Sequence, residues 1–153
     1  MSIPSRLANA EGEWVGPSLL CFAPDQPTIT SDSTATIARV VNGTALEIHY
    51  DWSYDEKPHQ GVLIVADSKG DKRCEISWMD SFHYAHRIML LTGEYAGDGE
   101  INVRGAYAAP EGPDWGWRMT LEMPDAGTFI LRMFNITPDE QEAWAVEATY
   151  RRR

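Results

Sequence analysis

Short segments in which apolar and polar residues alternate are the dominant feature of this 153-residue sequence. In residues 46–52, Leu, Ile, Tyr and Trp alternate with Glu, His and Asp, and the pattern recurs in residues 74–80, 101–107, 117–123 and 129–135. A period of two places successive side chains on opposite faces of a strand. The sequence therefore predicts β-strands with one buried face, and helix only as one short turn at residues 5–10.

Turn-forming residues separate these segments. Asn42-Gly43 favours a two-residue hairpin, because both central residues of a type I′ turn need positive φ. Residues 97–99 and 124–127 carry similar combinations of Gly, Asp and Pro. Together the signals predict about ten strands, centred near residues 16, 37, 48, 63, 76, 90, 103, 119, 131 and 146.

Short links between strands favour antiparallel pairing of sequence neighbours. An open sheet of this kind would leave two exposed edges, and closure removes them. We therefore predict an all-β fold, a single antiparallel up-and-down β-barrel, with a two-sheet sandwich as the alternative. No linker or repeat divides the chain, so residues 1–153 are expected to form one domain, with residues 1–10 as a lead-in.

Charge and composition exclude several classes of partner. Thirteen Lys and Arg stand against 23 Asp and Glu, a formal net charge of −10, which disfavours nucleic acid and anionic membranes. The N-terminus lacks the basic and apolar blocks of a secretory signal, so we expect a cytoplasmic setting. Cys21 and Cys74 lie in apolar segments and are expected to be buried free thiols rather than a disulfide.

The inward faces of the predicted barrel are rich in aromatic rings. If the charged faces point to solvent, the interior receives Tyr50, Trp52, Trp78, Asp80, His86, Tyr107, Trp117, Met119, Met133 and Asn135. Apolar surface with a few polar groups is typical of a ligand pocket. The alternative is a small barrel whose own side chains fill it completely.

Residues 80–83 (Asp-Ser-Phe-His) bring together the residue types of a catalytic triad. A triad needs the His between the Ser and the acid in space, so we expect a hydrogen-bonding cluster at the barrel mouth instead. His83 and His86 could join Asp80 around a metal only if the chain bends, since a strand sends them to opposite sides. Neither a catalytic residue nor a metal site is expected.

The segment 110–117 is an unusually aromatic connection that contains Trp115 and Trp117. It could form a lid or rim over the pocket, a plug of the barrel end, or an interaction module that docks a partner or forms a homodimer. Glu147 lies in an apolar final strand. An inward Glu147 would be a buried acid or base, and an outward one an ordinary surface charge.

The motif Gly12-Glu13-Trp14 resembles the start of lipocalin and calycin-type barrels. That resemblance implies that Trp14 closes the barrel floor and that a basic side chain from residues 151–153, Arg151, Arg152 or Arg153, packs across it. A closer resemblance covers roughly residues 10–152. The segments 78–83, 112–118, 133–138 and 145–151 are similar to an uncharacterised bacterial family catalogued as a domain of unknown function, which implies a lipocalin-like barrel and supplies no activity.

Nitrobindins, haem-binding barrels of similar size, are the nearest functional analogue. Their resemblance implies an iron-ligating histidine near the C-terminus, whereas the histidines here are at positions 49, 59, 83 and 86. We therefore expect no haem and no other cofactor.

The sequence favours a protein that binds a small apolar or aromatic ligand in the barrel. The expected binding residues are Tyr50, Trp52, Trp78, Asp80, His83, His86, Tyr107, Trp115, Trp117 and Asn135. The alternative is a cofactor-independent enzyme in the same cavity. In it His83 or His86 would act as the base, oriented by Asp80 or Glu147.

Overall fold

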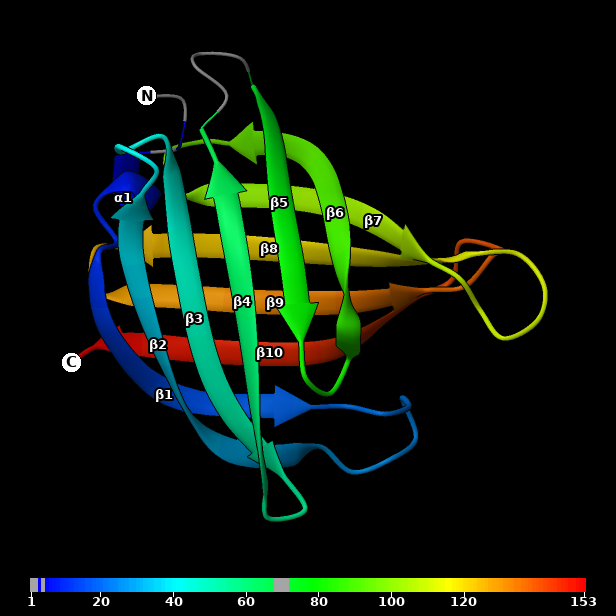
Figure 1. The fold of residues 1–153 in the computed structure, drawn as a ribbon. Coiled ribbons are helices and arrows are strands. Elements are labelled where there is room, and N and C mark those ends of the chain that lie inside the picture. Colours follow the sequence, from blue (N-terminus) through cyan, green and yellow to red (C-terminus); the bar gives the residue numbers. More distant parts are fainter. Residues whose placement is uncertain (1–2, 4, 68–71) are drawn as a thin grey trace.

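The computed structural model describes residues 3, 5–67 and 72–153 (Figure 1). A single helical turn, α1 (Ser5–Ala8), precedes the strands. The ten strands are β1 (Gly12–Leu20), β2 (Ile29–Val40), β3 (Ala45–Tyr54), β4 (Lys57–Ala66), β5 (Arg73–Asp80), β6 (Tyr84–Ala96), β7 (Glu100–Tyr107), β8 (Trp115–Asp125), β9 (Thr128–Ile136) and β10 (Glu142–Arg152).

The strands form one closed antiparallel barrel in sequence order, and β1 pairs with β10 to close it. The predicted all-β, lipocalin-like up-and-down barrel is confirmed, and the sandwich is excluded. All ten predicted strand centres fall within strands. The predicted helical turn is present, but it ends at Ala8, two residues earlier than expected. Within the described residues no helix is long and apolar enough to cross a membrane.

Trp14 closes one end of the barrel, as the resemblance to lipocalins implied. Its side chain is fully buried and its Nε1 donates to the Ala10 carbonyl oxygen at 2.9 Å. Of the three C-terminal arginines, Arg152 supplies the cationic contact, with its guanidinium carbon 4.5 Å from the centroid of the Trp14 ring. The same guanidinium donates to the carbonyl oxygens of Asn9, Glu11 and Ala126.

The in–out alternation holds through most of the barrel wall. Outward-facing Arg132 pairs with Glu122 and, at 3.4 Å, with Glu147. Glu147 is therefore an ordinary charge on the outer surface. Cys21 and Cys74 are buried free thiols, as predicted, and burial raises the pKa of Cys74 to about 11.

Antiparallel order gathers five connections at the end of the barrel opposite Trp14 (Figure 1). We call this end the open end. Its connections are residues 21–28, 55–56, 81–83, 108–114 and 137–141.

A bulge interrupts the pairing of β5 with β6 near the open end. Trp78 pairs with Met89 but Asp80 pairs with Tyr84, so the first part of β6 contains extra residues. His86 lies in this bulge with a φ of 62° and is exposed on the outer surface. The prediction that His86 points inward is wrong, because the bulge reverses the alternation there.

Strands β6 and β7 separate towards the open end. Their pairing extends from Ala96↔Glu100 to Thr92↔Arg104 and then stops, although β6 begins at Tyr84 and β7 continues to Tyr107. Figure 1 shows β6 bending away from β7 in this region. Side chains of the two unpaired segments, Met89 of β6 and Tyr107 of β7, line a cavity beside the β5–β6 turn.

Candidate functional site

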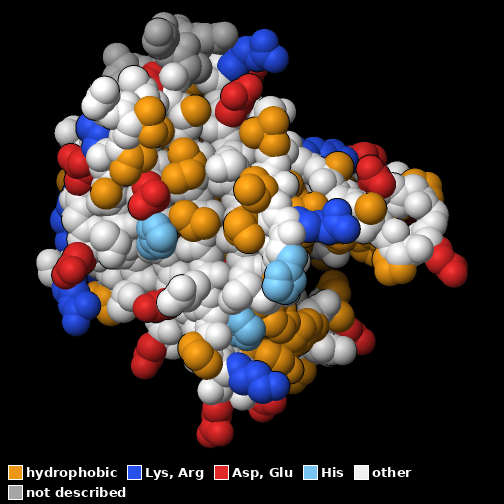
Figure 2. All heavy atoms as spheres, in the orientation of Figure 1, with side chains coloured by type: hydrophobic (Ala, Val, Ile, Leu, Met, Phe, Trp, Pro, Cys, Tyr) orange, Lys and Arg blue, Asp and Glu red, His pale blue; other side chains and the backbone are white. Residues whose placement is uncertain are grey.

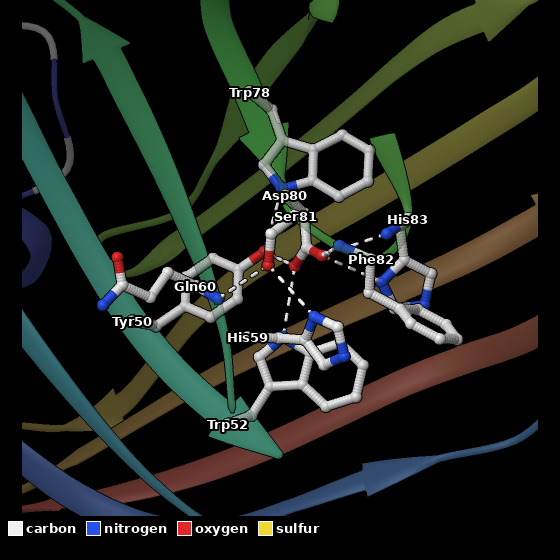
Figure 3. A network of polar contacts seen from close by, with 9 residues as sticks. All are labelled: Tyr50, Trp52, His59, Gln60, Trp78, Asp80, Ser81, Phe82 and His83. Atoms are coloured by element: carbon white, nitrogen blue, oxygen red, sulfur yellow. Dashed lines mark hydrogen bonds and ion pairs between the residues drawn. The ribbon is translucent and has the colours of Figure 1, made fainter. Parts of the chain in front are cut away.

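Asp80, the last residue of β5, is a buried carboxylate whose two oxygens are both occupied (Figure 3). Its Oδ2 accepts hydrogen bonds from the Tyr50 hydroxyl at 2.6 Å and from Trp52 Nε1 at 3.3 Å. Its Oδ1 accepts from the backbone N–H groups of Phe82 at 2.8 Å and His83 at 3.0 Å. Asp80 therefore ties the β5–β6 turn to strand β3.

Gly61 makes this connection possible. It lies in strand β4, between β3 and β5. It pairs with Tyr50 on one side and with Asp80 on the other, so the Tyr50 ring passes over Gly61 to reach the carboxylate. A Cβ atom on Gly61 would lie 2.0 Å from Cζ of Tyr50. The absence of a side chain at residue 61 is therefore a requirement of the Tyr50–Asp80 hydrogen bond.

The Asp80 carboxylate is ionised at neutral pH. Burial acts to raise its pKa, but the His83 ring, the Tyr50 hydroxyl and the His83 backbone N–H outweigh burial and lower the pKa to about 2. Burial and the adjacent carboxylate raise the pKa of Tyr50 well above its usual value, so its hydroxyl stays a donor. Trp78 Nε1 donates in turn to the Tyr50 oxygen at 2.9 Å.

The β5–β6 turn places two aromatic rings over the end of the barrel, which we call the plug (Phe82 and His83). The His83 ring stacks on Trp52 with 5.5 Å between centroids, and Phe82 contacts the same indole edge-on at 5.2 Å. Beneath the plug the interior cavity is only about 10 Å³, room for about one water molecule. The deep interior is thus filled with side chains, and the larger free volume lies beside the plug.

The aromatic crevice is a cavity of about 270 Å³ at the open end, where β6 and β7 are no longer paired. It is lined by Trp78, Phe82, His83, Tyr84, Met89, Tyr107 and Trp117. A second crevice of about 170 Å³ lies on the other side of the plug, towards Phe22, Asn135 and Trp144. His83 and Trp117 line both crevices.

Three parallel rings form one wall of the aromatic crevice. Tyr84 stacks on Trp78 at 6.1 Å and 7°, and Trp78 stacks on Trp117 at 5.5 Å and 9°. Tyr107 meets Trp117 edge-on at 6.4 Å, and its hydroxyl donates to Asn135 Oδ1 at 2.5 Å. Flat, parallel faces of this kind favour the stacking of a planar ring.

Two of the side chains that line the crevice, Trp117 and His83, carry a buried polar atom without a hydrogen-bond partner. In the described part of the chain, three buried side-chain polar atoms lack one: His83 Nδ1, Trp117 Nε1 and Thr120 Oγ1. His83 Nδ1 lies 3.6 Å from Asp80 Oδ1, beyond hydrogen-bond distance. Because buried polar groups are normally paired, the unpartnered N–H of Trp117 is a candidate contact for a ligand, whereas His83 Nδ1 faces the Asp80 carboxylate.

Ser81 does not complete a catalytic triad with Asp80 and His83. Its Oγ accepts from the backbone N–H of Gln60 at 3.0 Å and bonds to Nδ1 of His59 at 3.1 Å. His83 lies inside the barrel mouth and His86 outside it. No group of three or more His, Cys, Asp or Glu side chains among the described residues could hold a metal ion.

The predicted binding residues divide into four groups in the structure. The aromatic crevice contains Trp78, His83, Tyr107 and Trp117, and Asn135 lies behind Tyr107. The network that holds the plug contains Tyr50, Trp52 and Asp80. Trp115 is half-buried at the rim, where it pairs with Tyr107 outside the crevice lining. His86 lies on the outer surface.

Sequence reasoning missed four residues of this site: Gly61, Phe82, Tyr84 and Met89. Phe82 lies inside the segment 78–83 that carried the family resemblance, so its place in the turn was the available signal. Tyr84 and Met89 enter the crevice only because β6 bulges and separates from β7. No local pattern in the sequence marks that separation.

Comparison with known proteins supports the fold and the family. The structure is similar to the crystal structure of Rv2717c from M. tuberculosis, with a TM-score of 0.67 and 13% sequence identity over 96% of this chain and 94% of that chain. At this identity the likeness concerns the fold alone. No curated protein matches the chain. The family model described as "Protein of unknown function (DUF1579)" matches residues 4–152. The chain therefore belongs to the DUF1579 family of proteins of unknown function.

Proposed function

We propose that this protein binds a small planar aromatic molecule in the aromatic crevice. The observation that carries the proposal is that Trp117, whose indole N–H has no hydrogen-bond partner, lines a cavity of about 270 Å³. The ligand packs against the aromatic wall of the crevice and accepts a hydrogen bond from Trp117 Nε1.

The volume of the aromatic crevice limits the size of the ligand. Drug-sized molecules occupy pockets of roughly 300–1,000 Å³, so a cavity of about 270 Å³ suits a molecule of one or two fused rings. Asp80 contributes indirectly, because it holds the backbone of the plug and thereby fixes the crevice before the ligand arrives. The Trp117 N–H, rather than Asp80, orients the ligand, because the oxygens of Asp80 are occupied.

An acid–base enzyme in the same cavity has less support. That alternative requires a second ionisable group beside His83 that is free to move a proton. Glu147 is on the outer surface, where it pairs with Arg132, and both oxygens of Asp80 already accept hydrogen bonds. Binding without catalysis is the simpler function for this arrangement.

Quinoline and naphthalene test the proposal, because they share a shape and differ in one ring nitrogen that accepts a hydrogen bond. Titration followed by tryptophan fluorescence should show quinoline binding about fivefold more tightly, as one hydrogen bond of about 1 kcal/mol requires. Trp117→Phe removes the donor, so the two affinities should become equal. Trp144→Phe, on the other side of the plug, should keep the preference.

Two results would contradict this proposal. One is the absence of quinoline binding at millimolar concentration. The other is a preference for quinoline that survives in Trp117→Phe, since the hydrogen bond would then be made elsewhere.

A further inference from the structure

We infer that the ligand of the aromatic crevice is a cation, a planar heteroaromatic molecule that carries a positive charge and an acceptor atom at its edge. This inference rests on the proposed function and adds the charge of the ligand to it. Three independent features of the open end favour a positive charge: the acidic loops around it, the buried carboxylate beneath the plug, and the aromatic faces in the crevice wall.

The five loops of the open end carry seven carboxylates and no Lys or Arg. The carboxylates are Asp25, Asp55, Glu56, Glu111, Asp114, Asp139 and Glu140. Figure 2 shows acidic side chains at the protruding tips of the β3–β4 turn and the β7–β8 loop. Of the seven, Glu140 alone forms an ion pair in the described structure, with Arg104 at 2.7 Å. We call the other six the acidic rim.

The positive side chains near the rim do not cancel it. Lys57 begins β4 directly after the β3–β4 turn, and the exposed Arg87 lies in β6 shortly after the β5–β6 turn. These two cations stand against the six carboxylates of the acidic rim. On the outer wall Arg104 is paired with Glu140 and Arg118 with Glu142. Several cationic side chains lie instead at the opposite end of the barrel: Arg6, Arg151, Arg152 and Arg153. The open end therefore has a negative potential that attracts cations and repels anions.

The second feature is the ionised Asp80 carboxylate, which is only 2% exposed. Its hydrogen-bond donors are a hydroxyl, an indole and two backbone N–H groups, and no Lys or Arg is among them. Burying a charge is costly even with the His83 ring 3.6 Å from Oδ1, and the field of the carboxylate extends far in surroundings of low dielectric constant. A cation in the adjacent crevice reduces that cost.

The third feature is the aromatic wall. Trp117 and Tyr84 line the crevice beside the almost fully buried Trp78. An aromatic face presents the negative side of the ring quadrupole to a cation, and Trp is the strongest partner for cation–π contact. The unpartnered indole N–H of Trp117, a side chain 6% exposed, independently requires an acceptor on the ligand. A planar cation with an edge oxygen or nitrogen meets both requirements.

Three probes of matched shape separate charge from stacking: 6-methoxy-N-methylquinolinium (cation), 6-methoxyquinoline (neutral) and quinoline-6-carboxylate (anion). Isothermal titration at low salt should show the cation binding about tenfold more tightly than the neutral probe, and the anion more weakly than both. Raising the salt from about 20 mM to about 500 mM should reduce the advantage of the cation, because rim charges are screened, and leave the neutral probe unchanged.

Charge-neutralised variants locate the effect. Combining Asp25→Asn, Glu56→Gln, Glu111→Gln and Asp114→Asn removes four rim charges and should lower the affinity of the cation severalfold without changing that of the neutral probe. The matched control, Glu13→Gln, Glu94→Gln, Asp98→Asn and Glu100→Gln, removes four exposed carboxylates at the opposite end and should leave the preference intact.

The outcomes distinguish the two proposals. If 6-methoxyquinoline binds and the cation binds no more tightly, the charge inference is wrong and the planar-ligand proposal stands. Equal loss of cation affinity in the rim variant and the control would also overturn the inference, since the rim would have no special role. If none of the three probes binds, the proposed function itself fails.

Discussion

Replacing Asp80 by asparagine is expected to lower the free energy of unfolding by about 3 kcal/mol. The substitution removes a buried charge that accepts four hydrogen bonds, and it turns an amide NH₂ group towards donors such as the Tyr50 hydroxyl and Trp52 Nε1. Removing one partner from a buried, hydrogen-bonded charge network lowers the free energy of unfolding by roughly 3–5 kcal/mol. Urea denaturation at pH 7 measures the loss, with Asp32→Asn on the exposed outer face of β2 as the control.

The same variant has a defined pH dependence. The pKa of Asp80 is lowered from 3.8 to about 2 in the folded protein, so its stabilising contribution is fully present above pH 3.8. The contribution is lost as the pH falls from 3.8 towards 2, and it amounts to about 2 kcal/mol at 1.36 kcal/mol per pKa unit. The stability difference between the wild type and Asp80→Asn should therefore shrink over this interval. Equal stability of Asp80→Asn and Asp32→Asn at pH 7 would contradict the account of Asp80.

Gly61→Ala is the second substitution with a large expected effect, a loss of about 2–3 kcal/mol. The new methyl group would lie 2.0 Å from Cζ of Tyr50 and must displace a buried ring, which breaks the Tyr50–Asp80 hydrogen bond. Thermal denaturation with Gly127→Ala as the control measures this effect. At Gly127 the nearest atom to a new Cβ is Asp125 Oδ1 at 3.5 Å, so little change is expected there.

Combining Gly61→Ala with Asp80→Asn tests the proposed mechanism of destabilisation. Both changes act on the Tyr50–Asp80 contact, so the loss in the double variant should be smaller than the sum of the two single losses. Full additivity, or a Gly61→Ala protein as stable as the wild type, would show that the Tyr50 ring is not held as described.

The strands could be predicted because the patterns that specify them lie within short segments of the sequence. Alternation with a period of two specifies which residues of β3, β8 and β9 face inward, and turn residues such as Asn42-Gly43 separate neighbouring strands. The prediction failed at His86 because the bulge in β6 depends on how Asp80 pairs with Tyr84. Asp80 is in turn hydrogen-bonded to Tyr50 and Trp52, residues about thirty positions earlier, so the environment of this turn is not local in sequence.

The candidate site was predictable in part for the same reason. The alternation of apolar and polar residues is enough to place Trp78 and Trp117 inside the barrel, and both residues line the crevice. Its open side could not be predicted, because it exists only where β6 leaves β7 after Thr92↔Arg104. The role of Asp80 could be identified only from the structure. The alternation predicted that its carboxylate points inward, but not that backbone N–H groups of the plug would occupy one of its oxygens.

The most direct test of the central claim is the NMR spectrum of the indole N–H groups during a titration with quinoline. The Trp117 Nε1 proton has no partner in the free protein, so its resonance should move downfield as it donates to the ring nitrogen. The Trp14 Nε1 proton already donates to the Ala10 carbonyl oxygen at the opposite end, and its resonance should stay in place. A Trp117 signal that is unchanged at saturating quinoline would contradict a ligand site in the aromatic crevice.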